Sequence, residues 1–212
     1  MDKTEKDKRD NVAYGISQFY SKKFKTLDFD GKWLDVIGKP ELSGSWFIWG
    51  NSGNGKTSFT AQLCKYLSNF GKVAYNSMEE GLSESLKRCF QIADITTEDN
   101  IILLDKEPIN ELKIRLRKPK SPQFVIIDSL QYSGLNAMQY KLLQSQFSNK
   151  LFIIVSHAEG KQPAGRSART IHYDANVKIW IEGFKAFPKS RYGGGSEFVI
   201  WNEKAEQIWL NS

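Results

Sequence analysis

Residues 46–57, which read WFIWGNSGNGKT, decide the fold of this chain. The apolar residues 46–49 predict a buried strand, and the following G-x-x-x-x-G-K-T pattern is typical of a phosphate-binding loop that opens a helix. Glycines let the backbone N–H groups of such a loop turn toward phosphates, and the helix adds the positive end of its dipole. We therefore expect a nucleotide to be bound by Gly50, Asn51, Ser52, Gly53, Asn54, Gly55, Lys56, Thr57 and Ser58.

Two side chains of this loop have distinct expected roles. The Lys56 ammonium can reach the β and γ phosphates, and the Thr57 hydroxyl can ligate Mg²⁺. The sequence thus predicts binding of ATP together with Mg²⁺. The alternative is a glycine-rich turn in which the Lys-Thr pair has no such function.

Length and composition are those of an ordinary globular protein. The 212 residues suit one domain with an N-terminal appendage, and 40% of them are hydrophobic and 25% charged. The net charge of +6 is compatible with nucleic acid binding or with a basic solvated surface. The N-terminus lacks the apolar core of a signal peptide, no apolar run reaches membrane-spanning length, and Cys64 and Cys89 form no C-x-x-C pair. We expect a cytoplasmic protein that does not enter membranes.

Three segments follow from the pattern along the chain. Residues 1–10 are a charge run and are expected to be disordered. Residues 11–44 contain an amphipathic helical pattern, from Val12 through Ile16 to Phe24, and a connector rich in Gly, Asp and Pro. Residues 45–212 form the expected ATPase domain.

Predicted strands and helices alternate after the loop. Helical patterns at 59–70, 82–93, 108–116 and 137–147 separate apolar strands at 72–77, 101–104, 124–127 and 151–155. The segments 177–181, 198–201 and 207–210 then read as strands without long helices between them, the last two as a hairpin. This order predicts an α/β fold of three layers, with a mainly parallel sheet and C-terminal antiparallel strands.

Polar residues follow three of the predicted parallel strands, where such sheets bind ligands. Glu79 and Glu80 are placed to orient the water that attacks the γ-phosphate, or they are acids that stabilise a helix N-terminus. Asp128 is placed to hold Mg²⁺, or it is a helix cap. His157 can contact the γ-phosphate and report its loss, or it is a loop histidine satisfied by backbone.

Four stretches together resemble a known family. GNSGNGKT, VAYNSMEE, FVIIDS and IIVSH are similar to the motifs of the RecA-like superfamily of P-loop ATPases, and most similar to its RadA/KaiC and DnaB-type branch. The resemblance covers roughly residues 41–194. Lys189-Ser190-Arg191 resembles a late K-x-R motif of that branch, although Ser190 and Tyr192 replace the more usual Asn and Phe.

The resemblance implies roles for several of these residues. Glu79 would be the catalytic glutamate, with Glu80 as its neighbour. Lys189 and Arg191 would reach across a subunit interface onto the next protomer's nucleotide, where such fingers stabilise the transferring phosphoryl group. The protein would then be a homo-oligomer, a ring or a filament. The alternative is that Lys189 and Arg191 belong to a basic turn.

The same resemblance implies binding of single-stranded DNA in recombination, repair or replication. The family uses loops after the Asp128 strand and after the His157 strand, which here correspond to residues 131–139 and 159–173. The second of these contains Lys161, Arg166 and Arg169, and a flexible basic loop can follow a phosphate backbone. A solvated surface loop would have the same composition.

Three other functions remain open at the level of sequence. One is a KaiC-like regulatory ATPase that does not bind nucleic acid. Another is a small P-loop kinase that acts on a metabolite. The third is a nucleotide-dependent binding module with negligible turnover.

Overall fold

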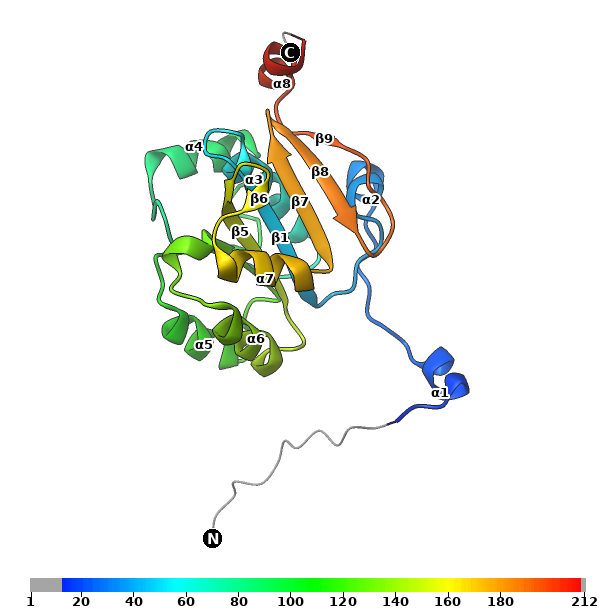
Figure 1. Ribbon diagram of the computed structural model, residues 1–212. Coiled ribbons are helices and arrows are strands. Elements are labelled where there is room, and N and C mark those ends of the chain that lie inside the picture. The colour runs from blue at the N-terminus through cyan, green and yellow to red at the C-terminus, as the bar shows by residue number, and fades with distance from the viewer. Residues whose placement is uncertain (1–12, 211–212) are drawn as a thin grey trace.

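The computed structural model describes residues 13–210 and has three layers, with a mainly parallel sheet between two layers of helices (Figure 1). This confirms the α/β architecture predicted above. The charge run at residues 1–10 lies outside the described residues. Within residues 13–210, no helix combines the length and the apolar character needed to cross a bilayer.

The sheet contains the strands β3, β2, β4, β5, β1, β7, β8 and β9 in that order, and the short β6 pairs with β5. Its strands are β1 Gly44–Gly50, β2 Val73–Ser77, β3 Ile101–Asp105, β4 Phe124–Asp128, β5 Leu151–Glu159, β6 Gln162–Pro163, β7 Val177–Glu182, β8 Lys185–Ser190 and β9 Phe198–Val199. The pairs β3–β2, β2–β4, β4–β5, β5–β1 and β1–β7 are parallel. The short β6 pairs antiparallel with β5. The pairs β7–β8 and β8–β9 are antiparallel.

Both faces of the sheet are covered, which explains why its central strands are continuously apolar. The helices are α1 Ile16–Ser21, α2 Gly31–Ile37, α3 Lys56–Leu67, α4 Glu84–Ile92, α5 Ile109–Arg117, α6 Ala137–Gln146, α7 Arg166–Asp174 and α8 Asn202–Trp209, with a 3₁₀ turn at Leu130–Tyr132. Helices α2, α3 and α4 pack on one face, where Trp46 and Ile48 point. Helices α5, α6 and α7 pack on the other face around Phe47.

Strand register brings the polar ends of four strands together. Ser77 pairs with Asp128, Asp128 pairs with Val155, and Gly50 pairs with His157. The carboxyl ends of β2, β4, β5 and β1 therefore lie at one edge of the sheet, where a ligand site is expected in a parallel α/β fold.

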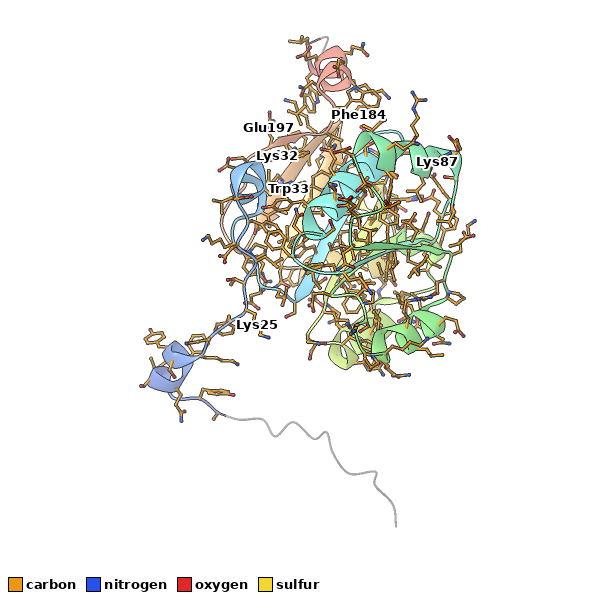
Figure 2. The ribbon with its side chains drawn as sticks, turned by 180° about the vertical axis from the view of Figure 1, so that it is seen from behind. Lys25, Lys32, Trp33, Lys87, Phe184 and Glu197 are labelled. Carbon is orange, nitrogen blue, oxygen red and sulfur yellow. The ribbon has the colours of Figure 1, made fainter. Side chains whose placement is uncertain are left out.

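The connector at residues 27–44 is part of the packed body. It contains α2, which the sequence did not predict, and Trp33 stacks against Phe198 at 4.9 Å between ring centres (Figure 2). Trp33 and Ile37 are buried in the same core cluster as Trp46, as their apolar character predicted. Helix α1 differs, because none of its residues is buried and it extends away from the body (Figure 1). It is also shorter than the predicted pattern and ends before Phe24.

The C-terminal strand prediction is wrong in two places. Residues 185–190 form β8, which the sequence did not predict because Pro188 interrupts the strand pattern. Residues 207–210, predicted as a strand of a hairpin, belong to α8 and its C-cap. Asn202-Glu203-Lys204-Ala205-Glu206-Gln207 contains mostly good helix formers, and this preference outweighs the short apolar alternation at the end. Strand β9 is correspondingly short, at Phe198–Val199.

A close backbone contact fixes the connector to the end of β8. Gly38 has a φ of +87°, and a Cβ atom there would lie 2.0 Å from the Tyr192 carbonyl oxygen. We expect Gly38→Ala to lower the free energy of unfolding by about 2–4 kcal/mol, because positive φ and steric overlap both oppose the alanine. Urea denaturation measures the change.

Gly134→Ala is the matched control. Gly134 has a φ of +70°, but a Cβ atom added there would have nothing within 4 Å. It should lose only about 1 kcal/mol, the cost of positive φ. Equal losses in the two variants would contradict the contact.

Candidate nucleotide-binding site

The predicted phosphate loop connects β1 to α3 and adopts a conformation that requires glycine. Gly53 and Gly55 have φ values of +76° and +98°, and α3 begins directly afterwards at Lys56. A Cβ at Gly50 would lie 2.3 Å from the Ile181 carbonyl oxygen of β7. The loop therefore passes close to β7 and presents the N-terminus of α3, which favours an anion.

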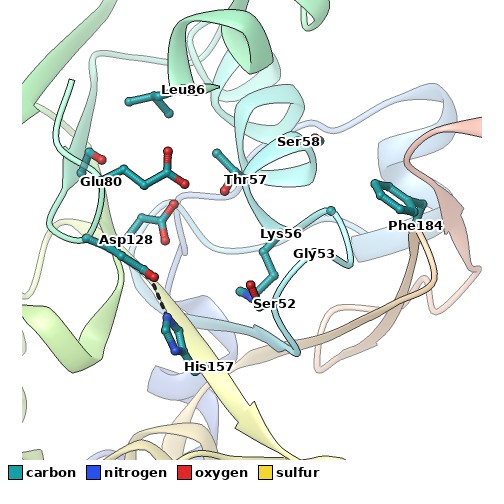
Figure 3. A pocket seen from close by; sticks show the side chains of 13 residues that line it. Ser52, Gly53, Lys56, Thr57, Ser58, Glu80, Leu86, Asp128, His157 and Phe184 are labelled. Carbon is teal, nitrogen blue, oxygen red and sulfur yellow. Dashed lines mark hydrogen bonds and ion pairs between the residues drawn. The ribbon is translucent and has the colours of Figure 1, made fainter. Parts of the chain in front are cut away.

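A cavity of about 260 Å³ opens in front of this loop (Figure 3). It is lined by residues from the ends of β1, β2, β4 and β5, together with the start of α3. The lining residues are Ser52, Gly53, Gly55, Lys56, Thr57, Ser58, Ser77, Glu79, Glu80, Leu86, Asp128, His157 and Phe184. Ten of the candidates from the sequence thus meet around one space, among them Lys56, Thr57, Glu79, Asp128 and His157.

The other three loop residues shape the cradle from outside the cavity lining. The Asn54 side chain accepts a hydrogen bond from the Gly183 N–H at 2.7 Å and donates to the Ser52 carbonyl at 3.1 Å. Asn51 donates through Nδ2 to the Gly160 carbonyl at 3.3 Å. These contacts fasten the loop to the β7–β8 turn on one side and to the β5–β6 hairpin on the other.

The Lys56 side chain donates to the Asn51 carbonyl at 3.0 Å. Burial lowers the pKa of Lys56, and the nearby carboxylates of Asp128 and Glu79 oppose that shift. An ammonium held among backbone groups at the head of a helix is well placed to exchange this carbonyl for a phosphate oxygen. The chemistry of the cradle therefore fits a triphosphate.

Asp128 ends β4 and is directed into the cavity opposite Thr57 (Figure 3). Burial raises the pKa of Asp128 to about 6, and a hydrogen bond donated by the Tyr75 hydroxyl partly opposes the shift. A buried carboxylate facing a hydroxyl supplies the hard oxygen ligands that Mg²⁺ prefers. Asp128 and Thr57 would hold that ion, so the donor set fits the expected magnesium.

Glu79 and His157 are hydrogen-bonded at the cavity wall. Glu79 Oε2 lies 2.7 Å from His157 Nε2 and accepts a hydrogen bond from the Ser129 hydroxyl at 3.2 Å. Side chains from two elements, β5 and the end of β4, therefore orient one carboxylate. Glu80 also lines the cavity, but its Oε2 accepts hydrogen bonds from Ser83 and Ser85 at the start of α4. The two glutamates thus have different surroundings, a distinction that the sequence did not provide.

Several lining residues were missed by the sequence reasoning. Phe184 lies in the β7–β8 turn and reaches the cavity beside the loop (Figure 3). Gly183 after the strand at 177–181 is a turn signal that could have indicated such a hairpin, but no hairpin was predicted there. Tyr75 is fully buried in β2 and is hydrogen-bonded to Asp128, a role that nothing in its sequence context indicated.

Lys189 and Arg191 lie at the opposite end of the sheet from this cavity. Lys189 pairs with Lys178 near the start of β7, whereas the phosphate loop follows the carboxyl end of β1. The pKa of Lys178 is lowered first by burial and further by Arg191 and Lys189, so these three cations gather there. Neither Lys189 nor Arg191 is brought to the cavity of its own chain.

The two segments expected as DNA-binding loops contain regular structure. Residues 131–139 include part of the 3₁₀ turn and the start of α6, and residues 159–173 include β6 and most of α7. The expectation of a flexible basic loop at 159–173 is therefore wrong. Lys161 sits in the β5–β6 turn, Arg166 begins α7, and Arg169 pairs with Glu159 at 3.1 Å. Arg166 and Arg169 line a shared open groove along α7.

Comparison with known proteins supports the fold but gives no close relative. No family model matches the chain. The chain is 23% identical over 213 aligned positions to the DNA repair protein RadA of Streptococcus pyogenes serotype M3, in two strains. The match covers 91% of this chain but only 44% of RadA, so the chain spans less than half the length of the curated relatives it matches.

Three solved structures share its fold. They are the flagellar accessory protein FlaH from Methanocaldococcus jannaschii (TM-score 0.58, 16% identity, 83% of this chain and 94% of the other), the KaiC-like protein PH0186 from Pyrococcus horikoshii OT3 (0.54, 20%, 75% and 84%) and the ATPase domain of G40P (0.51, 14%, 77% and 83%). These likenesses establish the fold alone. Any function has to be inferred from the residues that line the cavity.

The cradle geometry predicts that Lys56 contributes directly to triphosphate affinity. Lys56→Ala should weaken binding of a fluorescent ATP analogue about 10- to 100-fold, the value of a charge-assisted hydrogen bond. Fluorescence titration measures the change. Lys87→Ala, which removes a charge from the exposed face of α4, should bind like wild type (Figure 2). Equal affinity of wild type and Lys56→Ala would contradict the assignment.

Proposed function

We propose that this protein, whose fold is that of the RecA-like P-loop ATPases, binds MgATP in the cavity and hydrolyses it as an assembly of several copies on single-stranded DNA. The observation that supports the proposal is the convergence of Lys56, Asp128 and Glu79 on one space in front of a glycine-shaped loop.

In this proposal the phosphates lie along the loop backbone at the head of α3. Lys56 gives up its bond to the Asn51 carbonyl and donates to the β and γ phosphates. Asp128 and Thr57 would hold the magnesium ion, which would neutralise phosphate charge when bound. The hydrogen bond from Tyr75 keeps the Asp128 carboxylate oriented in its buried position.

Glu79 orients and deprotonates the attacking water. Its carboxylate is held by His157 and Ser129, so it needs little reorganisation during the reaction. His157 also lines the space where a terminal phosphate would lie, which places the same side chain to sense the γ-phosphate while it orients the base.

Lys189 and Arg191 act in trans in this proposal. They are too remote to reach the cavity of their own chain, but they are exposed at the opposite end of the sheet, where a neighbouring copy can approach. The exposed arm around α1 supplies a second means of association. Its apolar side chains, which include Ile16, Phe19 and Tyr20, find no buried position on the body of their own chain.

Single-stranded DNA is the proposed polymer partner. Lys161, Arg166 and Arg169 project from the β5–β6 turn and from α7, and the β5–β6 turn is hydrogen-bonded to the phosphate loop through Asn51. Nucleotide state and DNA contact would therefore influence each other. The similarity to a DNA repair protein is consistent with this partner.

Mixing two inactive variants tests the trans arrangement. Glu79→Gln should lose about 10²- to 10⁴-fold in kcat because the base is removed, and Lys189→Ala/Arg191→Ala should lose roughly 10³-fold because the finger is removed. In a mixed assembly, Lys189 and Arg191 of a Glu79→Gln copy can reach the cavity of a double-variant copy, which still has Glu79. That interface then contains one complete site. ATPase activity of the mixture should exceed that of either variant alone. Activity that stays at the level of the separate variants would exclude fingers acting in trans.

The DNA partner is tested with the variant Lys161→Ala/Arg166→Ala/Arg169→Ala. Each lost single-strand phosphate contact lowers the slope of log K against log [salt] by about 0.7, so the slope should fall by about 2. Fluorescence anisotropy of a labelled oligonucleotide across a salt series measures it, and stimulation of the ATPase by DNA should fall in parallel.

The matched control removes three lysines elsewhere, the exposed Lys87 and Lys118 and the half-buried Lys113. If both triple variants retain the wild-type slope, DNA does not use these residues. If wild type shows no DNA affinity, the function becomes that of an ATPase that does not bind nucleic acid.

A further inference from the structure

A cleft at the end of β7 and β8 is not used by the nucleotide site. Its volume is about 300 Å³, and it is lined by Lys161, Trp180, Glu182, Phe187 and Trp209. These residues come from the β5–β6 turn, from β7, from β8 and from α8, four elements that meet at the same end of the sheet (Figure 1). Three of the five side chains are aromatic, and the cleft lies on the face opposite the one that packs against α3.

The rings are held in fixed positions, and their polar groups are satisfied within the protein. Trp180 Nε1 donates to Glu182 at 3.1 Å, and Trp209 Nε1 donates to the Gly183 carbonyl at 3.0 Å. Trp180 packs on Trp49 at 5.5 Å, and Phe187 packs edge-on against Trp209 at 5.8 Å. Because the indole N–H groups are already used, the rings offer a ligand their apolar surfaces.

The charges differ between the rim and the interior of the cleft, so each favours a different chemical group of a ligand. Lys161 is exposed at its rim, and Lys185 lies 5.3 Å from the centre of the Trp209 ring while paired with Glu197. The Glu182 carboxylate beside Trp180 disfavours a phosphate inside the cleft but retains acceptor capacity for an amino group. A flat ring carrying an amino group fits the interior, and an anion fits the rim.

The cleft is also continuous with the proposed DNA surface. Trp49 Nε1 donates to the Lys161 carbonyl at 3.1 Å, which fixes the β5–β6 turn beside Trp180. A strand whose phosphates contact Lys161 would therefore bring its next base to the aromatic rings. Base–aromatic stacking of this kind accompanies backbone contacts in single-strand binding.

We propose that this cleft is a nucleobase-stacking site, in which Phe187, Trp180 and Trp209 hold one unpaired base of the single-stranded DNA that Lys161 contacts through its phosphate. The inference rests on the proposed function, because it names a second point of contact for the same strand. It assigns the late aromatic residues, which the nucleotide chemistry does not use, to recognition of the polymer.

The test compares two oligonucleotides of equal length, oligo(dC) and a strand of the same backbone without bases. Wild type should bind oligo(dC) more tightly. Phe187→Ala should weaken binding of oligo(dC) about 5- to 100-fold, leave binding of the abasic strand unchanged, and keep the salt slope, because no phosphate contact is lost. Phe187→Tyr, which keeps a ring, should bind like wild type.

Leu103→Ala, an exposed apolar truncation in β3 at the far edge of the sheet, is the control and should change neither affinity. Wild-type affinity for an ATP analogue verifies that each variant is folded. Tryptophan fluorescence gives a measurement without substitution, since stacking on Trp180 and Trp209 should quench wild-type emission with oligo(dC) and not with the abasic strand.

The outcomes separate the two claims. If wild type binds both strands equally, or if Phe187→Ala weakens both strands alike, the stacking site is refuted while DNA binding stands. If Phe187→Ala changes only the mass of the assembly and neither affinity, the cleft is a contact between copies and the inference is overturned. If wild type binds neither strand, the proposed DNA partner fails together with it.

Discussion

The parallel pairing of β1 with β5 on one side and β7 on the other is the constraint on which the rest of the structure depends. It sets Gly50 opposite His157 and close to Ile181, so the phosphate loop starts at a fixed point between two strands. The same alignment, continued through β4 and β2, brings Asp128 and Ser77 to that edge. Because a parallel register cannot slip by one residue without exchanging its two faces, both the core and the cavity follow from a single alignment.

The cavity concentrates charge that burial opposes. Asp128 is half-buried with a pKa raised by desolvation, and the pKa of Lys56 is lowered by the same cause, so each is held in an environment that disfavours its ionised form. Tyr75 and the mutual attraction of the two groups offset part of that cost. A charged ligand that brings its own counter-charge would offset the remainder, and groups perturbed in this way are typical of functional sites.

The central part of the fold could be predicted from the sequence because its signals are local. The apolar runs at residues 124–127 and 151–155 are long enough to be strands, and glycine spacing identifies the loop that precedes Lys56. The C-terminal third could not be predicted in the same way. Pro188 interrupts the strand pattern of β8, and the apolar residues near Trp209 suggested a strand although the helix formers before them decide the outcome.

For the site as for the fold, only features with a local sequence signal could be predicted. Residues that follow strands, such as Glu79 and Asp128, can be found from the pattern, because strand ends determine their place. The partners of those residues cannot, since Tyr75, Ser129 and Phe184 become neighbours only through the register of separate strands. The resemblance to RecA-like ATPases was confirmed at the level of fold, whereas the roles of individual residues and the DNA partner remain predictions.

The attachment of Asn54 to the β7–β8 turn has a consequence for how the chain can be divided. Asn54 receives the N–H groups of both Gly183 and Phe184, so the shape of the phosphate loop is secured by residues more than a hundred positions away. A fragment that ended after β7 would retain each of the four recognisable motifs and still lose these hydrogen bonds to Asn54. The smallest fragment that keeps the phosphate loop in shape therefore includes the segment after β7, which a motif search would leave out.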